Sequence, residues 1–350
     1  MYCLVSVVIR QWTAVHEEAQ AFKRQALHAS TAVGVARPPV FTAASGFLLV
    51  VDWDAERVVG GLELPKPMGF LLDRGRLQVA LWAEDEIATL SGPKIVVRHR
   101  HRWFNHLHTL ERTPRGLLVT SSGTDLLAEI DERGEIVWEF FLFEHGYGGK
   151  RYRLGQTFDR SLDYNRRYLP AALTTHPNSA ILVDEHTVLA TLFSTGELVR
   201  IDRRSGQVDV VLDGMKRPHS IRRRAEGGYM LCDTEGGAVV LLDRDLRCEG
   251  RIPVPAPWIQ DAVFAGERLF VAGNRRIVMG PLTQKAEEAG GDNCVIELRG
   301  GTPCKRLNFG SDSRVYMVEP IAGEDAESLA HSWRGKAMDT TWIRWETPCG

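Results

Sequence analysis

The chain has few of the features that mark a membrane protein, a disulfide-bonded secreted domain or a nucleic-acid-binding domain. No apolar run approaches the roughly 20 residues that a membrane-spanning helix needs. The net charge of −2 predicts no general attraction to nucleic acid or anionic lipid. The six cysteines are scattered without a Cys-x-x-Cys pair, which favours free thiols in a reducing compartment. The short apolar segment 1–10 lacks the basic flank and cleavage site of a signal peptide, so we interpret it as a strand. These absences predict a cytoplasmic protein without a nucleic-acid or membrane partner.

The chain is rich instead in glycine and in short apolar runs. Its 350 residues include 33 glycines, and apolar runs such as 47–51, 77–81, 229–231 and 269–272 are bounded by turn-forming residues. A second apolar run follows each of them after about ten residues. Four short strands in a unit of about 40 residues are typical of a propeller blade. We therefore predict an all-β protein, and 44% hydrophobic residues are enough for a packed core.

Three segments, 106–131, 176–202 and 217–243, repeat one another. Each begins with a polar motif (His-Leu-His-Thr, His-Pro-Asn-Ser and Arg-Pro-His-Ser) and ends on an aspartate after a nearly constant spacing. A regular repeat indicates one supersecondary unit used several times, with equivalent residues facing a common axis. The units begin near residues 38, 68, 106, 176, 217 and 259, which predicts a six-bladed β-propeller.

The segments outside the repeats are predicted to decorate this single domain, which spans 1–350. The long gap between the third and fourth units predicts an insertion of about 30 residues at 141–172, between blades 3 and 4. We expect this insertion to cover the mouth of the central channel. Segment 14–28 has a helix-favouring composition and predicts a short N-terminal helix, and 325–337 would form another.

The two ends of the chain leave the number of blades open. A seventh blade would form if the strand at 1–10 and the segment 305–320 completed another sheet. An N-terminal strand that joined the last blade would instead close the ring without an exposed sheet edge.

The innermost strand of each blade lines the channel of a propeller, so the polar motifs of the repeats supply the candidate site residues. Aligned on their second strands, the blades place His108, Asn178 and His219 at one level, with Asp261 at that level in the next unit. Residues two apart in a strand share a face. The channel is therefore predicted to be lined by His106, His108, His176, Asn178, Arg217, His219 and Asp261.

Imidazole and carboxylate groups at one level suit a divalent metal such as Zn²⁺ or Fe²⁺, with Ca²⁺ as a further candidate. Three protein ligands would leave a position open for water or substrate. The predicted metal ligands are His108, His176 and His219. The predicted catalytic residues are His106, Asp261, Arg217 and Asn178. The alternative is that these histidines hydrogen-bond to backbone groups and ordered water in a wet channel.

The predicted insertion concentrates tyrosine and arginine. As a cover over the channel it would suit an anionic ligand, because guanidinium groups pair with carboxylate, sulfate or phosphate. The predicted substrate-binding residues are Tyr152, Arg153, Arg166, Arg167 and Tyr168. The alternative is a solvated surface excursion. The predicted substrate is therefore a small, anionic organic molecule.

The segments 104–110, 176–181 and 217–221, with 134–139 closing a blade, resemble the arylsulfotransferase-type and NHL-type six-bladed propellers. In the arylsulfotransferase group a His-x-Asn-Ser element and a further channel histidine recur, and the chemistry runs through a sulfated histidine. The related amidating-lyase and lactonase propellers bind a metal in the same channel. The first resemblance thus implies nucleophile and sulfate-binding roles for His176, His219 and Arg217, and the second implies metal binding by the channel histidines.

Three functions from different classes remain open from the sequence. The first is a metal-dependent lyase, hydrolase or oxidative enzyme, which elemental analysis would identify. The second is metal-free group transfer of the arylsulfotransferase kind, which would leave a covalently modified histidine. The third is a non-catalytic binding or scaffold propeller, in which the exposed blade rims would be the sensitive surface.

Overall fold

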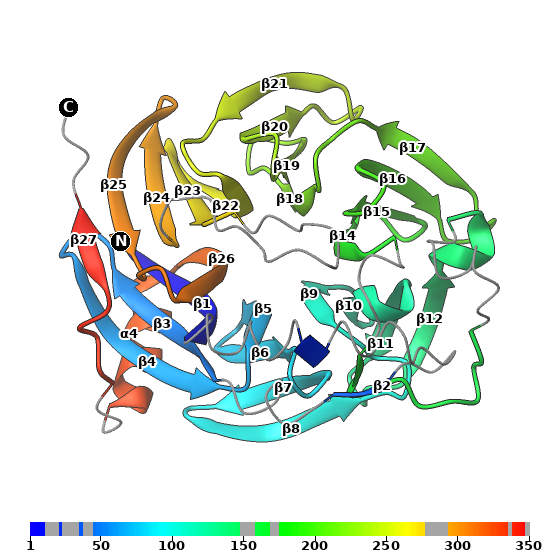
Figure 1. Cartoon of the computed structure of the whole chain (residues 1–350), viewed down its shortest axis with the longest axis horizontal. Coiled ribbons are helices and arrows are strands. Elements are labelled where there is room, and N and C mark those ends of the chain that lie inside the picture. The colour runs from blue at the N-terminus through cyan, green and yellow to red at the C-terminus, as the bar shows by residue number, and fades with distance from the viewer. Residues whose placement is uncertain are drawn as a thin grey trace.

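The structure, a computed structural model, describes residues 1–10, 21–22, 35–37, 45–147, 158–168, 175–276, 293–334 and 338–346. Within this part of the chain, six antiparallel sheets stand around a central axis as the blades of a propeller (Figure 1). Helix α4 (Gly323–Trp333) packs outside them. The fold is therefore all-β and six-bladed, as the repeats predict.

Blades 2 to 6 follow one another along the chain, each with its strands in order from the channel outwards (Figure 1). Blade 2 contains β5 (Pro67–Asp73), β6 (Arg76–Leu81), β7 (Glu86–Ser91) and β8 (Lys94–Arg100). Blade 3 contains β9 (Leu107–Arg112), β10 (Gly116–Ser121), β11 (Leu126–Asp131) and β12 (Ile136–Phe141). Blade 4 contains β14 (Pro177–Leu182), β15 (Thr187–Leu192), β16 (Glu197–Asp202) and β17 (Val208–Leu212). Blade 5 contains β18 (His219–Arg223), β19 (Tyr229–Asp233), β20 (Ala238–Leu242) and β21 (Cys248–Pro253). Blade 6 contains β22 (Trp258–Ala265), β23 (Arg268–Asn274), β24 (Cys294–Arg299) and β25 (Thr302–Asn308), to which β27 (Arg344–Glu346) adds a fifth strand.

Blade 1 is built from both ends of the chain. From the channel outwards its strands are β26 (Ser313–Ile321), β1 (Tyr2–Arg10), β3 (Gly46–Asp52) and β4 (Arg57–Leu64). Strand β1 is antiparallel to both neighbours, with Val5 opposite Val318 on one side and Leu49 on the other. The segments that a seventh blade would need are thus used to close the ring, which pairs both edges of β1. The prediction that blade 1 begins near residue 38 is therefore wrong, because the innermost strand of that blade comes from residues 313–321.

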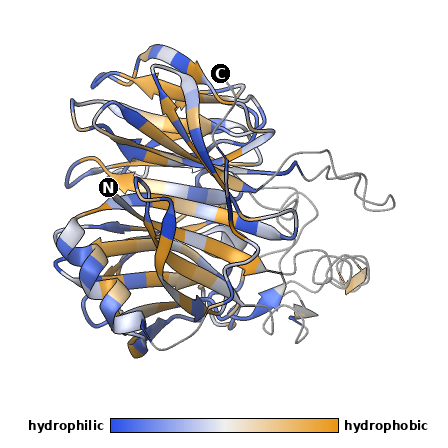
Figure 2. Cartoon of the chain, turned by 90° about the vertical axis from the view of Figure 1, so that its left-hand side faces the viewer, coloured by the Kyte–Doolittle hydropathy of each residue, from blue (hydrophilic) through white to orange (hydrophobic). Residues whose placement is uncertain are grey.

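Apolar side chains fill the spaces between neighbouring blades. All six residues of β10 are buried, and Leu118 and Leu127 of blade 3 pack in one cluster with Leu182 and Val199 of blade 4. Apolar residues run along the strands in Figure 2. Because both faces of each sheet meet another blade, the middle strands are nearly continuous apolar runs. These are the runs that predict the strands from the sequence.

The additions to the propeller are described in part. Helix α4 confirms the helix expected at 325–337, and its buried residues Ala326, Leu329 and Trp333 share a cluster with side chains of blades 1 and 2. Of the helix expected at 14–28, the structure describes Ala21 and Phe22, both helical, and the rest lies outside the described residues. No helix in the described ranges has the length and apolar character that a membrane crossing requires.

The predicted insertion between blades 3 and 4 is described at 141–147 and 158–168. It begins with the 3₁₀ turn η2 (Leu142–His145), and further along, the two-residue strand β13 (Arg167–Tyr168) pairs with β2 (Val35–Ala36). The insertion and the segment that follows β1 therefore meet in one small sheet.

Aspartates in tight turns tie blades 2 and 3 to the blades that follow them. Asp85 and Asp125 come after the second strands of these blades and have left-handed φ angles of 52° and 53°. The carboxylate of Asp85 accepts a hydrogen bond from the backbone N–H of His106 at 2.8 Å. That of Asp125 accepts hydrogen bonds from the backbone N–H groups of Thr175 at 2.8 Å and His176 at 3.1 Å. These contacts fix the points at which the inner strands of blades 3 and 4 begin.

Replacing Asp125 tests this anchoring role. Asp125→Ala leaves two buried backbone donors without their acceptor, and we expect the free energy of unfolding in urea to fall by about 3 kcal/mol. Asp125→Asn, which keeps an acceptor oxygen, is expected to lose less. Asp245→Ala, at an exposed turn, is the control and should change stability by less than about 0.5 kcal/mol. An Asp125→Ala protein as stable as this control would contradict the assignment.

Candidate functional site

The inner strands do not begin as regular strands. The residues just before them in blades 2 to 5 have left-handed φ angles: Lys66 (49°), His106 (52°), His176 (55°) and Arg217 (61°). A bulge then interrupts the pairing of each inner strand of blades 2 to 6 near its start. The rule that residues two apart share a face applies only to regular extended backbone. The predicted pairs such as His106 and His108 therefore need not point the same way.

Two aromatic side chains occupy equivalent positions, each directly after the second strand of its blade. Trp82 of blade 2 lies under the Lys66 ammonium at 4.5 Å and stacks on the His106 ring at 5.0 Å. Phe193 of blade 4 contacts the His176 ring at 5.2 Å and lies 5.4 Å from the Arg217 guanidinium. Each aromatic ring thus contacts the left-handed residue of its own blade and that of the next. His106 and His176, which the sequence treats as equivalent, belong to two different clusters.

The three predicted metal ligands do come together, in an arrangement that we call the histidine cluster. It contains His108, His176, Phe193, His219, Trp258 and Tyr316. The ring centroids of His108 and His176 are 4.9 Å apart in a T-shaped contact, and Phe193 contacts both His176 and His219. The three histidines are each less than 9% exposed. Imidazoles from three separate blades therefore lie near one another, with His108 against His176 and with Phe193 between His176 and His219.

The imidazole nitrogens of the cluster differ in their hydrogen bonding. Nδ1 of His219 is 2.8 Å from the Thr234 hydroxyl and 3.0 Å from the Arg217 carbonyl oxygen. Nδ1 of His108 is 2.9 Å from the Tyr316 hydroxyl. Nε2 of His108 and Nδ1 of His176 are buried and have no hydrogen-bond partner among the described residues. Buried polar atoms are nearly always paired in native proteins, so each of these two nitrogens is a position for ordered water or for an atom of a ligand.

Burial keeps all three imidazoles neutral. Desolvation lowers the pKa of His176 to about 4 and that of His219 to about 3, and it lowers the pKa of His108 well below the usual value. Neighbouring histidines lower the pKa of His108 further, because a second positive charge nearby would be repelled. At pH 7 each ring therefore has one N–H donor and one lone pair.

The cluster fits a metal ion only in part. The two unpartnered nitrogens of His108 and His176 are donors of the kind that Zn²⁺ and Fe²⁺ bind. The third predicted ligand, His219, has its Nδ1 in hydrogen bonds and would bind through Nε2, but the ring of Phe193 contacts both His219 and His176. No group of three His, Cys, Asp or Glu side chains in the described ranges is placed to hold one ion.

Asp261 does not join the histidines. Its carboxylate accepts hydrogen bonds from Nε and Nη2 of Arg222 at 2.9 Å and 2.7 Å, from the Ser220 hydroxyl, and from the backbone N–H of Val318 at 2.9 Å. In the pairing of β22 with β23, Ile259 stands opposite Gly273 as His219 of blade 5 stands opposite Cys232, so the position equivalent to His219 belongs to Ile259 and not to Asp261.

Asp261 and Arg222 line a pocket of about 210 Å³ that residues of all six inner strands enclose. Its polar groups also include Glu111 and Glu319, and Glu319 forms a second ion pair with Arg222. Burial raises the pKa of Glu111, while the guanidinium of Arg223 lowers it. Tyr316 lines this pocket and also hydrogen-bonds to His108, so it borders both parts of the channel.

Asn178 and Arg217, two further predicted catalytic residues, contact the neighbouring blade. The Asn178 amide donates to the Pro218 carbonyl oxygen at 3.0 Å and accepts from the Thr191 hydroxyl at 2.6 Å, so it joins blades 4 and 5. The Arg217 guanidinium lies over Phe193 and Trp258, 3.0 Å from Glu235. Its side chain is 28% exposed, which leaves part of a cation at the edge of the histidine cluster.

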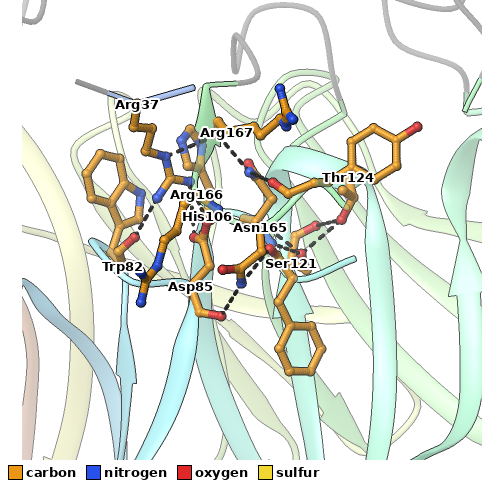
Figure 3. Close-up of polar contacts among 12 residues, drawn as sticks. Arg37, Trp82, Asp85, His106, Ser121, Thr124, Asn165, Arg166 and Arg167 are labelled. Carbon is orange, nitrogen blue, oxygen red and sulfur yellow. Dashed lines mark hydrogen bonds and ion pairs between the residues drawn. The ribbon is translucent and has the colours of Figure 1, made fainter. Parts of the chain in front are cut away.

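The described part of the insertion is fastened over blades 2 and 3 (Figure 3). The Asn165 amide donates to the Asp85 carbonyl oxygen at 2.9 Å, and the backbone N–H of Arg166 donates to the Asp85 carboxylate at 2.8 Å. The same carboxylate forms a fully buried ion pair with Arg37 at 2.8 Å. Burial raises the pKa of Asp85, and the Arg37 guanidinium opposes this shift. This network, in which the backbone N–H of His106 also takes part, anchors the insertion to Asp85 of blade 2.

The structure describes the side chains of two of the five predicted substrate-binding residues, Arg166 and Arg167. The Arg166 side chain is half exposed, 3.2 Å from Glu86, and Nε of Arg167 donates to the Asp163 carbonyl oxygen at 3.2 Å. Tyr152, Arg153 and the side chain of Tyr168 lie outside the described residues. The contacts shown for Arg166 and Arg167 are to the surface around blade 2 and to the insertion itself.

Sequence reasoning missed four aromatic residues: Phe193, Trp258 and Tyr316 of the histidine cluster, and Trp82, which stacks on His106 in the neighbouring cluster. The repeats contain a signal for Trp82 and Phe193, since both follow the second strand of a blade directly. Tyr316 could not be placed in this way, because its strand completes a blade whose other strands lie at the opposite end of the sequence.

Comparisons with known proteins support the fold alone. No family model and no curated protein matches the chain. A structure of a nidogen/laminin complex matches at 9% identity, over 91% of this chain and 97% of that one, with a TM-score of 0.56. A protein of unknown function from Bacteroides caccae matches at 12% identity, over 73% and 86%, with a TM-score of 0.52. Virginiamycin B lyase from Staphylococcus aureus, with quinupristin, matches at 11% identity, over 79% and 92%, with a TM-score of 0.48. At such identities the likeness shows that the chain is similar to β-propellers.

The neutral buried histidines predict a loss of stability in mild acid. Their folded-state pKa values lie below the value near 6.5 of the unfolded chain, so below that pH the unfolded state binds protons that the folded state does not. We expect the free energy of unfolding to fall by roughly 1.4 kcal/mol per pH unit for each such histidine as the pH drops from about 6.5 to 4.

Urea unfolding at pH 7, 6 and 5 measures this slope. His176→Gln should reduce this slope by roughly 1.4 kcal/mol per pH unit, the contribution of one proton, because glutamine does not titrate. His186→Gln, on a surface turn, is the matched control and should leave the slope unchanged. A free energy of unfolding that stays constant between pH 7 and 5 would contradict the buried neutral state.

Proposed function

We propose that the protein is an enzyme that binds a small, anionic organic molecule at the histidine cluster and acts on it by proton transfer through His108 and His176. One observation carries this proposal. Two adjacent, buried imidazoles each have a ring nitrogen without a partner among the described residues. An unpaired buried polar atom costs about 1–3 kcal/mol, so a ligand that pairs with these nitrogens would recover that free energy on binding.

The protonation state of the pair supports acid–base chemistry. A neutral imidazole can donate one proton and accept another, and it needs no counter-ion when buried. Hydrogen bonds are electrostatically stronger away from water, so fixed groups in a dry site act efficiently on a reacting atom. The partly exposed Arg217 beside the cluster supports the anionic character of the substrate, and the rings of Phe193 and Trp258 would contact its apolar part.

The finer parts of the proposal concern the cover and the metal. In it the insertion closes over the bound substrate, with Tyr152, Arg153, Arg166, Arg167 and Tyr168 as contacts, and the protein works in the cytoplasm. As an alternative to proton transfer by the same nitrogens, a divalent metal would use the lone pairs of Nε2 of His108 and Nδ1 of His176 as ligands, and it would supply Lewis-acid chemistry for a lyase, hydrolase or oxidative reaction. Elemental analysis of the purified protein and of His108→Gln tests this part. A stoichiometric metal that the variant lacks would support it.

The group-transfer alternative depends on the same atoms. A neutral His176 with an unpartnered Nδ1 has the lone pair that a nucleophile needs. Incubation with an aryl sulfate, followed by mass spectrometry of the peptide that contains residue 176, would reveal a sulfated histidine. A scaffold function predicts instead that substitutions on outer strands, such as the exposed Val96 or Val210, impair the protein, while substitutions in the channel do not.

Replacing the two histidines tests the enzyme. The wild-type protein would be incubated with a pool of small carboxylates, sulfate esters and phosphate esters, and loss of each compound followed by mass spectrometry. For a compound that is turned over, we expect His108→Gln and His176→Gln to lower kcat by about 10²-fold or more, the usual contribution of general acid–base catalysis. His186→Gln is the control and should have wild-type turnover. Wild-type turnover in both channel variants would exclude the proposal.

A further inference from the structure

We propose that Tyr316 fixes the tautomer of His108 and thereby makes Nε2 of that imidazole a hydrogen-bond donor toward an oxygen atom of the ligand. This inference rests on the metal-free, proton-transfer form of the proposed function and deepens it, because it names the chemical group that the site recognises. A metal ion on Nε2 of His108 would exclude it, since that nitrogen would then carry no proton. Tyr316 lies in β26, the inner strand of blade 1, and it reaches across to an imidazole of blade 3.

The geometry of the pair is that of a direct hydrogen bond. The Tyr316 hydroxyl oxygen is 2.9 Å from Nδ1 of His108, and both side chains are 7% exposed. The ring centroids are 5.7 Å apart, with the ring planes tilted by 30°. Nε2 on the far side of the imidazole is buried and has no partner in the described part of the chain.

The direction of this hydrogen bond follows from counting unpaired groups. If Nδ1 carried the imidazole proton, it would donate to the phenol oxygen, and the phenol proton would need another acceptor. Among the described residues, His108 is the hydrogen-bond partner of the Tyr316 hydroxyl, and no other acceptor for the phenol proton is present there. If Nε2 carries the proton, the phenol O–H donates to Nδ1 and one group fewer is left unpaired. Buried polar groups are rarely left unpaired, so the second arrangement is favoured.

The protonation states of both partners are consistent with this direction. Burial, and then the charge of Asp261, raise the pKa of Tyr316 above its usual value, so the phenol keeps its proton. Burial lowers the pKa of His108, so its ring has one proton to place. A protonated phenol beside a neutral imidazole donates to the ring nitrogen that holds the lone pair.

A fixed Nε2–H at a buried position without an acceptor selects the ligand. A carboxylate, sulfonate, sulfate or carbonyl oxygen would accept from it, whereas an ammonium group offers only donors and would leave the N–H unpaired. Arg217, on the neighbouring side of Phe193, is paired with Glu235 at 3.0 Å, and its partly exposed guanidinium has further N–H donors that an oxyanion would accept from. The ligand class that follows is a small organic acid, bound through one of its oxygen atoms to His108.

Nitrogen-15 NMR of the imidazole groups tests the tautomer directly. In the wild-type protein we expect the His108 resonances, identified by their loss in His108→Gln, to show a protonated Nε2 and an unprotonated Nδ1. Tyr316→Phe keeps the ring and removes the hydroxyl, and it should give a mixture of both tautomers with a similar Tm. Tyr229→Phe removes a phenol hydroxyl from β19, outside the histidine cluster, and should leave the His108 resonances unchanged.

The second measurement is binding of benzoate and of benzylamine as probes, followed through the same Nε2 resonance. Benzoate should shift it, with about tenfold weaker affinity in Tyr316→Phe, and benzylamine should not. A protonated Nδ1 in the wild-type protein, or an unchanged tautomer in Tyr316→Phe, would overturn the role of Tyr316 whatever the activity. Wild-type turnover in His108→Gln would overturn the proposed function but not the tautomer assignment.

Discussion

Closure of the ring through β1 and β26 is the constraint on which the channel depends. The C-terminal part of the chain supplies the inner strand of blade 1, and the N-terminal part supplies the three strands outside it. This pairing brings Tyr316 to His108 and Glu319 to Arg222. A chain open at this sheet would therefore lose contacts in both parts of the channel, besides exposing two sheet edges. The pairing that closes the ring therefore also completes the site.

Buried polar groups are compensated differently in the pocket around Arg222 and in the histidine cluster. Around the pocket, the Arg222 guanidinium is compensated by the carboxylates of Asp261 and Glu319, because an unpaired buried charge is strongly destabilising. In the histidine cluster the rings stay neutral, so no counter-ion is needed. A neutral imidazole can still exchange protons with a ligand, whereas a guanidinium held by two carboxylates is fixed in charge. The chemistry that we propose therefore belongs to the histidine cluster.

The sequence predicts the fold and brings out three histidines whose rings lie near one another, but it does not predict the direction in which several side chains point. Five of the six predicted unit starts agree with the observed inner strands, because each blade repeats the same turns and apolar runs. The inner strand of blade 1 could not be predicted from the repeats, since it lies at the far end of the chain. The side-chain positions of His106 and Asp261 could not be predicted for a local reason. A left-handed residue at 106 breaks the alternation of side chains on which the alignment relies, and Ile259 rather than Asp261 holds the position equivalent to His219.

These irregularities are also what make the site. A regular inner strand would present side chains of alternate residues to the channel at every level, in one repeating pattern. The left-handed residues instead send His106 to Trp82 and bring His176 against Phe193 and His108. Asp125 holds the second of these turns through the backbone N–H of His176. The position of the His176 ring is thus set from the neighbouring blade, so the blades must pack correctly before the two imidazoles can meet.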